Sequence, residues 1–322
     1  MSTAIALNAG SLIAAGMRAY FAPVDRTGGV PTPFDPSTMG RFDLDAPPAG
    51  WWSAGGVLGF KRASVSTVTP VWSGAPAIIK TQVQAGVGED VEFTFPGWSR
   101  IGMALSSGVE MLNLFVGAGG SNANPSGITA ALVEALLPGS TATLLQLQPG
   151  TAVRAGDLVV VDVDYTGQTG YLGSGAAGAY VKAAPQTIDL HAVRRASFNV
   201  ARVLSVNGTL CTLAAPLLAG APTAAMKLSR ITGFVDRSGG AFLPEWSGLF
   251  VLEGVQGERL LLHFPRLQPA GAGTAETGET LATGIGRWRP SAKLRALPVA
   301  DANDGTPSVC FRTYLPAPMR QV

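Results

Sequence analysis

The sequence contains few of the residues on which catalytic and metal sites are usually built. Only two histidines and two cysteines occur in 322 residues, and charged residues make up 14% of the chain, well below the usual value of about a quarter. Neither histidine belongs to an H-E-x-x-H pattern, and the chain has no C-x-x-C pair, G-x-S-x-G elbow or G-x-x-x-x-G-K-[ST] phosphate loop. We therefore expect a protein that is not an enzyme and that binds no cofactor or metal ion.

Charge and hydropathy argue against two further classes of protein. The formal net charge is +2, and no block of like charges marks a surface for nucleic acid. The apolar stretch 4–17 lacks the basic start of a signal peptide, and it is too short to cross a bilayer. Cys211 and Cys310 are expected to pack as small apolar side chains. The sequence thus predicts a soluble product made in the cytoplasm, with no membrane partner.

Turn-forming residues and strand periodicity dominate what the sequence does contain. There are 41 glycines and 23 prolines, and short alternating segments lie between them. Two-residue turns are expected at Asn207-Gly208 and Gln256-Gly257, each between two such segments. The length allows two domains with separate cores. The expected fold class is mainly β: a β-sandwich or barrel with one packed α-helix, plus a small inserted β-barrel domain.

The clearest pattern runs from Ala77 to Phe95. We expect one strand at Ala77–Gln84, a turn at Ala85–Gly88, and a second strand at Glu89–Phe95 that pairs with the first. Successive side chains of a strand point to opposite faces, so the alternation predicts a sheet with one polar and one packed face. Such a sheet suits the wall of a water-filled channel. The packed positions of the second strand are Val91, Phe93 and Phe95, and the polar positions are Asp90, Glu92 and Thr94.

A helix is expected directly after this strand pair. The segment Ser99–Leu114 repeats its apolar residues near the 3.6-residue period, and Ser99 suits the N-cap position. The apolar side of the helix would cover the packed face of the sheet. The residues expected at this sheet–helix contact are Val91, Phe93, Phe95, Ile101 and Leu105. A second helical stretch is expected at 128–137.

Composition divides the chain into three parts. Residues 1–50 hold a short apolar segment and a proline-rich arm at 23–50, which cannot be a central strand or a helix. The sequence leaves open whether this arm lies on its own domain, on another subunit, or is a floppy leader. Residues 51–142 and 236–322 are assigned together to one β domain. Residues 143–235 are assigned to the inserted β-barrel domain.

Strand and helix segments follow one another in a definite order through the larger domain. They are Gly59-Phe60 to Trp72-Ser73-Gly74, Ala77–Phe95, Trp98–Leu114, Leu249–Phe264 and Ser308–Leu315. This pattern covers about half of the chain. In pattern and order it resembles the tail tube proteins of tailed bacteriophages, the major tail protein family.

The resemblance implies a structural virion protein without catalysis or cofactor. Tail tube subunits form hexameric rings in which each subunit contributes strands to a continuous inner β-barrel, with the helix packed outside the wall. The rings stack through arms, loops and termini into a hollow tube for DNA passage, and an added domain sits outside. The implied partners are other copies of the chain, other tail proteins, and double-stranded DNA that passes without tight binding. The implied location is the virion tail, after synthesis in the host cytoplasm.

The polar face of the strand pair then supplies the expected lining of the lumen. Acidic or neutral polar side chains suit this lining, because they repel phosphate and avoid tight binding of DNA. Lys80 departs from a purely acidic lining. The lumen-facing candidates are Lys80, Gln82, Gln84, Asp90, Glu92 and Thr94.

Other functions are compatible with the sequence. The chain could instead be another virion component, such as a capsid decoration or baseplate protein. A carbohydrate-binding or carbohydrate-active domain would use Asp162 and Asp164, which share one strand face, together with the scattered tryptophans. Residues 173–178 match G-x-G-x-x-G, but the following residues show no helical period, so a surface loop is expected there.

Overall fold

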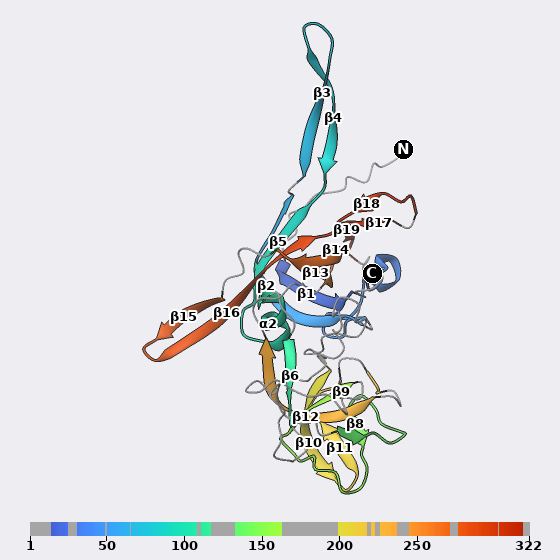
Figure 1. Ribbon diagram of the computed structural model, residues 1–322, viewed down its shortest axis with the longest axis vertical. Helices are drawn as coiled ribbons and strands as arrows, with labels where there is room; N and C mark the ends of the chain where they lie inside the picture. Colours follow the sequence, from blue (N-terminus) through green and yellow to red (C-terminus); the bar gives the residue numbers. More distant parts are fainter. Residues whose placement is uncertain are drawn as a thin grey trace, which may run out of the picture.

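The computed structural model shows a mainly β protein (Figure 1). It describes residues 14–24, 31–48, 50–64, 66–107, 111–116, 133–162, 199–217, 220–222, 226–236, 245–270, 276–301 and 303–317. The mainly β fold class expected from the sequence is confirmed. Neither of the helices in these ranges is long and apolar enough to cross a membrane.

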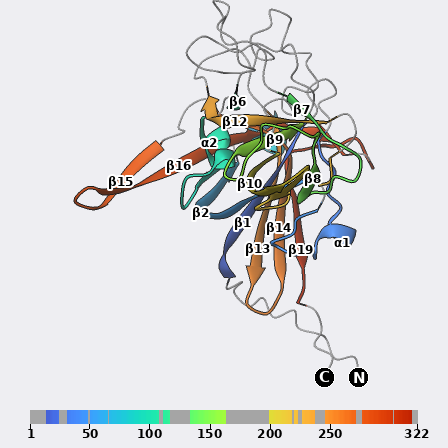
Figure 2. The same cartoon turned by 90° about the horizontal axis from the view of Figure 1, so that it is seen from below.

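The larger sheet contains a closed barrel. The eight strands of this sheet are β1 (Ala14–Pro23), β2 (Trp52–Ser64), β5 (Glu89–Thr94), β13 (Trp246–Gly254), β14 (Arg259–Pro269), β15 (Glu276–Ala282), β16 (Ile285–Ala296) and β19 (Phe311–Leu315). Six of them follow the order β16-β5-β2-β1-β13-β14, and pairing of β14 with β16 returns the sheet to its start. Figure 2 shows β1, β13, β14 and β19 side by side. A barrel of this kind removes the open edges of its own six strands where they pair.

The barrel interior is a single apolar cluster to which all six strands contribute. Phe93 of β5 and Phe250 of β13 are almost fully buried in it. Helix α2 (Arg100–Ser107) follows the end of β5 and adds Ala104 and Leu105 to the same cluster, so it covers that end of the interior. At the start of β5, Glu89 accepts a hydrogen bond from Nε of Arg62 at 2.7 Å. The interior is thus bounded by a helix at one end and by an ion pair at the other.

A long hairpin continues two strands of the barrel into solvent. β2 leads into β3 (Thr67–Ser73), and β4 (Ile78–Gly86) leads into β5, with the turn at 74–77. Figure 1 shows this β3–β4 hairpin rising from the barrel, while the β15–β16 hairpin projects in another direction. Since β16 pairs with β5 and β5 with β2, both hairpins extend one three-stranded wall, from opposite ends of β5. We call β2, β5 and β16 the wall.

The proline-rich arm lies on the outer face of its own barrel. Residues 31–48 include the short helix α1 (Pro36–Met39) and pack against β1, β13 and β14. Phe34 joins Tyr20 and Leu261 in an apolar cluster there. Nη1 of Arg259 donates a hydrogen bond of 2.6 Å to the carbonyl oxygen of Phe42. The sequence left open whether the arm lies on its own domain, on another subunit, or is a floppy leader. For residues 31–48 the structure shows the arm on its own domain.

A second, smaller sheet forms a separate unit below the barrel in Figure 1. Its seven strands are β6 (Met111–Phe115), β7 (Val133–Ala135), β8 (Leu144–Gln146), β9 (Leu158–Asp162), β10 (Val200–Asn207), β11 (Leu210–Leu213) and β12 (Lys227–Asp236). The order is β6-β12-β9-β10-β11-β8, with β7 also on β12, and a bridge between Leu136 and Leu147 joins the ends of β7 and β8. This unit has its own apolar cluster, which includes Cys211. Two further short strands, β17 (Val299–Ala300) and β18 (Pro307–Ser308), pair beside β19.

The second sheet begins earlier in the chain than residue 143. β6 and β7 both pair with β12, so the unit takes in residues from Met111 onward. The helix expected over Ser99–Leu114 ends at Ser107, and the described part of the helix expected at 128–137 contains a strand. Short apolar segments fit the period of a helix and the period of a strand equally well. In this chain, pairing with β12 makes β6 and β7 strands.

Candidate assembly surface

The outer face of the wall carries both signs of charge. The register aligns Glu92 with Lys61 on one side and Lys293 on the other, and it aligns Asp90 with Arg295. Nε and Nη2 of Arg295 donate to the Asp90 carboxylate at 2.8 and 3.1 Å. These hydrogen bonds hold the pKa of Asp90 below its usual value. The acidic or neutral lining expected from the sequence is therefore balanced on this face by basic side chains of neighbouring strands.

The six lumen-facing candidates fall on two different parts of the structure. Asp90, Glu92 and Thr94 share the outer face of the wall, where Thr94 lies 3.1 Å from the hydroxyl oxygen of Ser291. The other candidates are exposed on β4, which pairs with β3. The expected pairing of β4 with β5 is wrong, because the turn lies at 74–77 and both neighbours of β5 come from β2 and β16. The candidates on β4 are Lys80, Gln82 and Gln84.

The packing candidates meet inside the barrel. Val91, Phe93, Phe95 and Leu105 are all at most 1% exposed, and Ile101 packs against the same cluster. Their neighbours come from every strand of the closed barrel, as well as from α2. The helix therefore covers one end of the barrel interior, on the packed face of the wall and away from its polar outer face.

The β3–β4 hairpin exposes both apolar and polar side chains. Directly opposed residues of paired strands lie on the same face, and the register pairs Trp72 with Ile79. Every residue of the hairpin from 67 to 85 is exposed. The register shifts between Val71 and Trp72, so simple alternation does not continue through this point. The apolar side chains Val71, Trp72, Ile79 and Val83, which are 41%, 58%, 48% and 53% exposed, are together called the apolar hairpin face below. Val68, Gln82 and Gln84 point away from Val83, and Ile78 points away from Ile79.

The β15–β16 hairpin also exposes apolar side chains. Leu281, Ile285 and Trp288 are about half exposed near its end. A two-stranded hairpin is marginally stable by itself in water, and large exposed apolar patches usually mark interaction sites. Both hairpins are therefore candidate contact surfaces.

Comparison with known proteins gives no family. Neither a scan against protein-family models nor a search of curated proteins finds a match to this chain. A proposal for the function of this chain therefore depends on the geometry of the wall and its two hairpins.

The apolar hairpin face was not expected from the sequence to be a contact surface. The signal was present, because Val71, Ile79 and Val83 lie in a segment with a single charged residue, Lys80. Assigning β4 as the partner of β5 hid that signal, since it placed Ile79 and Val83 on the packed face of a sheet. Only the pairing of β4 with β3 leaves them in solvent.

The remaining candidate sites do not form a cluster in the described parts of the chain. Asp162 ends β9 opposite Lys227, whereas Asp164, His191 and residues 173–178 lie outside the described residues. No group of three or more His, Cys, Asp or Glu residues that could hold a metal ion occurs among the residues that were placed. Cys211 and Cys310 are both free, and burial raises the pKa of the Cys310 thiol to about 12.

Neighbouring carboxylates at the start of β5 allow a matched test of the wall. The Glu89 side chain is 10% exposed and its partner Arg62 is 31% exposed, whereas Arg295, the partner of Asp90, is 53% exposed. Glu89→Gln should lower the free energy of unfolding by about 1–3 kcal/mol, because Arg62 is left partly buried without its countercharge. Asp90→Asn should cost at most about 1 kcal/mol. Urea unfolding at pH 7 measures the change in the free energy of unfolding for each variant. Equal losses would contradict the placement of Glu89 on the inner face of the wall and of Asp90 on its outer face.

Proposed function

We propose that this chain is a structural virion protein of a phage tail, which assembles into stacked rings around a hollow tube for passage of double-stranded DNA. The observation that carries the proposal is the wall, which extends beyond its barrel at both ends as exposed hairpins with apolar side chains. A monomer gains nothing from such surfaces, whereas contacts between copies would bury them. The resemblance in element order supports the same function, with rings of six subunits. In this role the protein has no catalytic function.

Contacts at the two ends of the wall suit an assembly that grows in one direction. The β3–β4 and β15–β16 hairpins differ in sequence, so a contact between the β3–β4 hairpin of one copy and the β15–β16 hairpin of the next joins two different surfaces. Contacts of this heterologous kind produce closed rings or open filaments, depending on the rotation between copies. In a stack of rings, contacts within each ring close on themselves, whereas contacts between rings continue along the tube.

The polar surfaces are compatible with a lumen through which DNA slides. The polar side chains of the β3–β4 hairpin include one lysine and two glutamines, Lys80, Gln82 and Gln84, and the outer face of the wall pairs its acidic residues with basic ones. Tight binding of DNA requires several uncompensated basic groups on phosphates. A lumen lined by these faces would therefore retain duplex DNA only weakly.

Electron microscopy and sedimentation velocity of the purified chain test this proposal. The wild-type chain is expected to form rings and hollow filaments at increasing concentration. The double variant Ile79→Thr/Val83→Thr should raise the concentration needed for assembly by about tenfold or more, because it removes apolar groups from the apolar hairpin face.

The matched control changes the same residue types at side chains of the same hairpin that point away from Ile79 and Val83. Ile78→Thr/Val68→Thr should assemble as the wild type does, although both side chains are as exposed as those on the apolar face. A wild-type chain that stays monomeric at every concentration would contradict the proposal. Discrete trimers would favour a decoration protein instead, and binding in a glycan screen would favour a carbohydrate-binding domain.

A further inference from the structure

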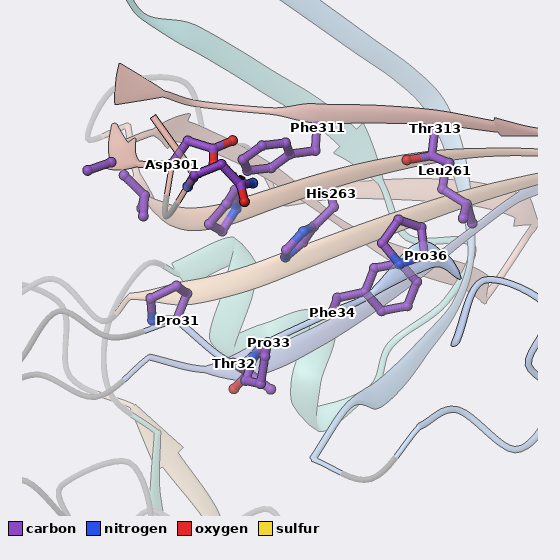
Figure 3. Close-up of a pocket in the computed structure, with 14 residues that line it drawn as sticks. Pro31, Thr32, Pro33, Phe34, Pro36, Leu261, His263, Asp301, Phe311 and Thr313 are labelled. Carbon is purple, nitrogen blue, oxygen red and sulfur yellow. Dashed lines mark hydrogen bonds between the residues drawn. The ribbon is translucent and has the colours of Figure 1, made fainter. Parts of the chain in front are cut away.

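A pocket opens on the outer face of β14 and β19, away from the wall. Its volume is about 360 Å³, within the usual range of about 300–1,000 Å³ for ligand pockets. Figure 3 shows Pro31, Pro33 and Phe34 of the arm on one side, with His263 and Phe311 across from them. Ala300 of β17 also lines it. The lining is mostly apolar, with flat rings on opposite sides, which is the form that suits an aromatic side chain.

The walls of this pocket are held in place by contacts within the chain. The ring of His263 lies 5.6 Å from that of Phe34 and 6.1 Å from that of Phe311, measured between ring centroids. The backbone N–H of Thr32 donates a hydrogen bond of 3.1 Å to the hydroxyl of Ser247. The arm is therefore fixed on the barrel before anything binds, and a preformed pocket costs little free energy of ordering on binding.

The chain itself supplies an aromatic group of suitable form. Trp72 is 58% exposed next to the turn of the β3–β4 hairpin, at the far end of the extended wall. Buried tryptophans on one partner, placed in a pocket of the other, are typical of residues that dominate binding free energy. In the same chain, Trp72 and the pocket lie on different elements, so a contact between copies joins two different surfaces.

Charge and free backbone groups favour the same contact. Lys80 is the one charged residue of the hairpin segment 67–86, whereas Asp301, which lines the pocket, and Asp304, in the adjoining turn, are acidic. Nearby Arg312 belongs to the opposite face of β19, because it alternates with Phe311 and Thr313, which line the pocket. Among the described strands β19 pairs with β14 alone, and such an edge can accept a strand from a partner.

We infer that the Trp72 end of the β3–β4 hairpin of one copy inserts into the pocket beside β19 of a second copy. The indole occupies the space between the arm prolines and Phe311, and Lys80 approaches the acidic turn. This inference rests on the proposed self-assembly and specifies one contact within it. A small aromatic molecule in the same pocket is the competing occupant.

Two variants that each remove one half of the contact provide the test. Trp72→Ala lacks the inserting side chain but keeps the pocket, whereas Ala300→Trp fills the pocket from its exposed rim and keeps Trp72. Each alone should raise the concentration needed for self-association by about tenfold or more. A 1:1 mixture should associate more strongly than either variant, because one member supplies Trp72 and the other an open pocket. Sedimentation velocity measures all three samples.

Controls separate loss of the contact from loss of the fold. Trp288→Ala removes an exposed tryptophan of the other hairpin, and Ala214→Trp adds one on the second sheet unit. Ala214→Trp should leave self-association unchanged, and any loss in Trp288→Ala belongs to the other hairpin, because that variant keeps both Trp72 and an open pocket. Thermal unfolding of every variant reports its folding.

The outcomes distinguish this contact from the tube itself. If Ala300→Trp assembles as well as the wild type, or if the mixture shows no recovery, the contact is refuted while the tube proposal stands. If the wild-type chain stays monomeric, both are refuted. If tryptophanamide binds the wild-type pocket but neither variant changes assembly, the pocket holds a small aromatic ligand and the inferred contact is again refuted.

Discussion

Replacing Phe250 by alanine is expected to lower the free energy of unfolding by about 3–5 kcal/mol. Phe250 is fully buried in the barrel interior, and its ring centroid lies 4.8 Å from that of Phe60 and 5.3 Å from that of Phe93. Removing the ring leaves a cavity among side chains that come from several strands, and a closed barrel cannot collapse easily to fill it. Urea unfolding followed by tryptophan fluorescence measures the change.

Two further variants make the Phe250 result specific to burial in the barrel. Phe250→Leu should lose clearly less than Phe250→Ala, because the cavity is smaller. Leu204→Ala, at a side chain 63% exposed on β10, should change the free energy of unfolding by less than about 0.5 kcal/mol. A loss below about 1 kcal/mol for Phe250→Ala would show that the interior is not packed as described.

Acid is expected to destabilise the chain through His263. Burial among the rings of Phe34, Trp51 and Phe311 lowers the pKa of His263 from its ordinary 6.5 to about 4. Between these two pH values the unfolded chain binds a proton at this histidine and the folded chain does not, so folding stability falls as the pH falls through this range. The full loss, reached below pH 4, is about 3 kcal/mol, because one pKa unit corresponds to about 1.4 kcal/mol.

The variant His263→Phe isolates this contribution. Phenylalanine keeps an aromatic ring among the neighbouring rings but does not titrate, so the variant should lose the part of the acid sensitivity that lies between pH 6.5 and 4. The other histidine, His191, is present in both proteins and cancels in the comparison. Urea unfolding at half-unit pH intervals gives the two profiles, and identical slopes would show that His263 is not buried in its neutral form.

Closure of the barrel within one chain changes what neighbouring copies have to supply. β5 has both of its partners, β2 and β16, in the same chain, so the base of the wall needs no strand from another subunit. Among the described strands of this region, the open edges lie instead outside the closed barrel, on β3, β4, β15 and β19. In the proposed tube, contacts between copies would therefore be made by the projecting hairpins and by the outer faces of barrels that are already complete.

Local patterns in the sequence were sufficient to identify two of the hairpins. A two-residue turn at Gly208-Thr209, one residue later than expected, joins β10 to β11, and the longer turn 255–258 around Gln256-Gly257 joins β13 to β14. Gly208 and Gly257 have positive φ values of 60° and 85°. Alternation in Glu89–Phe95 also identified the buried side chains Val91, Phe93 and Phe95 correctly. A strand with one face buried and the other in solvent must alternate apolar and polar residues. The mainly β class follows from many such segments.

The partner of each strand was decided by the tertiary structure wherever more than one partner fitted the pattern. Alternation specifies two faces but not the neighbour of a strand, so β4 could equally have turned back onto β5, whereas in the structure it pairs with β3. In the same way, Met111–Phe115 fits a helix or a strand until β12, more than a hundred residues later, offers it a partner. The sequence by itself therefore determined the β class, two of the hairpins and the buried face of β5. Closure of the barrel and the pocket beside β19 depend on contacts between segments far apart in the chain, and exposure of the apolar hairpin face depends on which of its two neighbours β4 pairs with. No local period encodes these contacts.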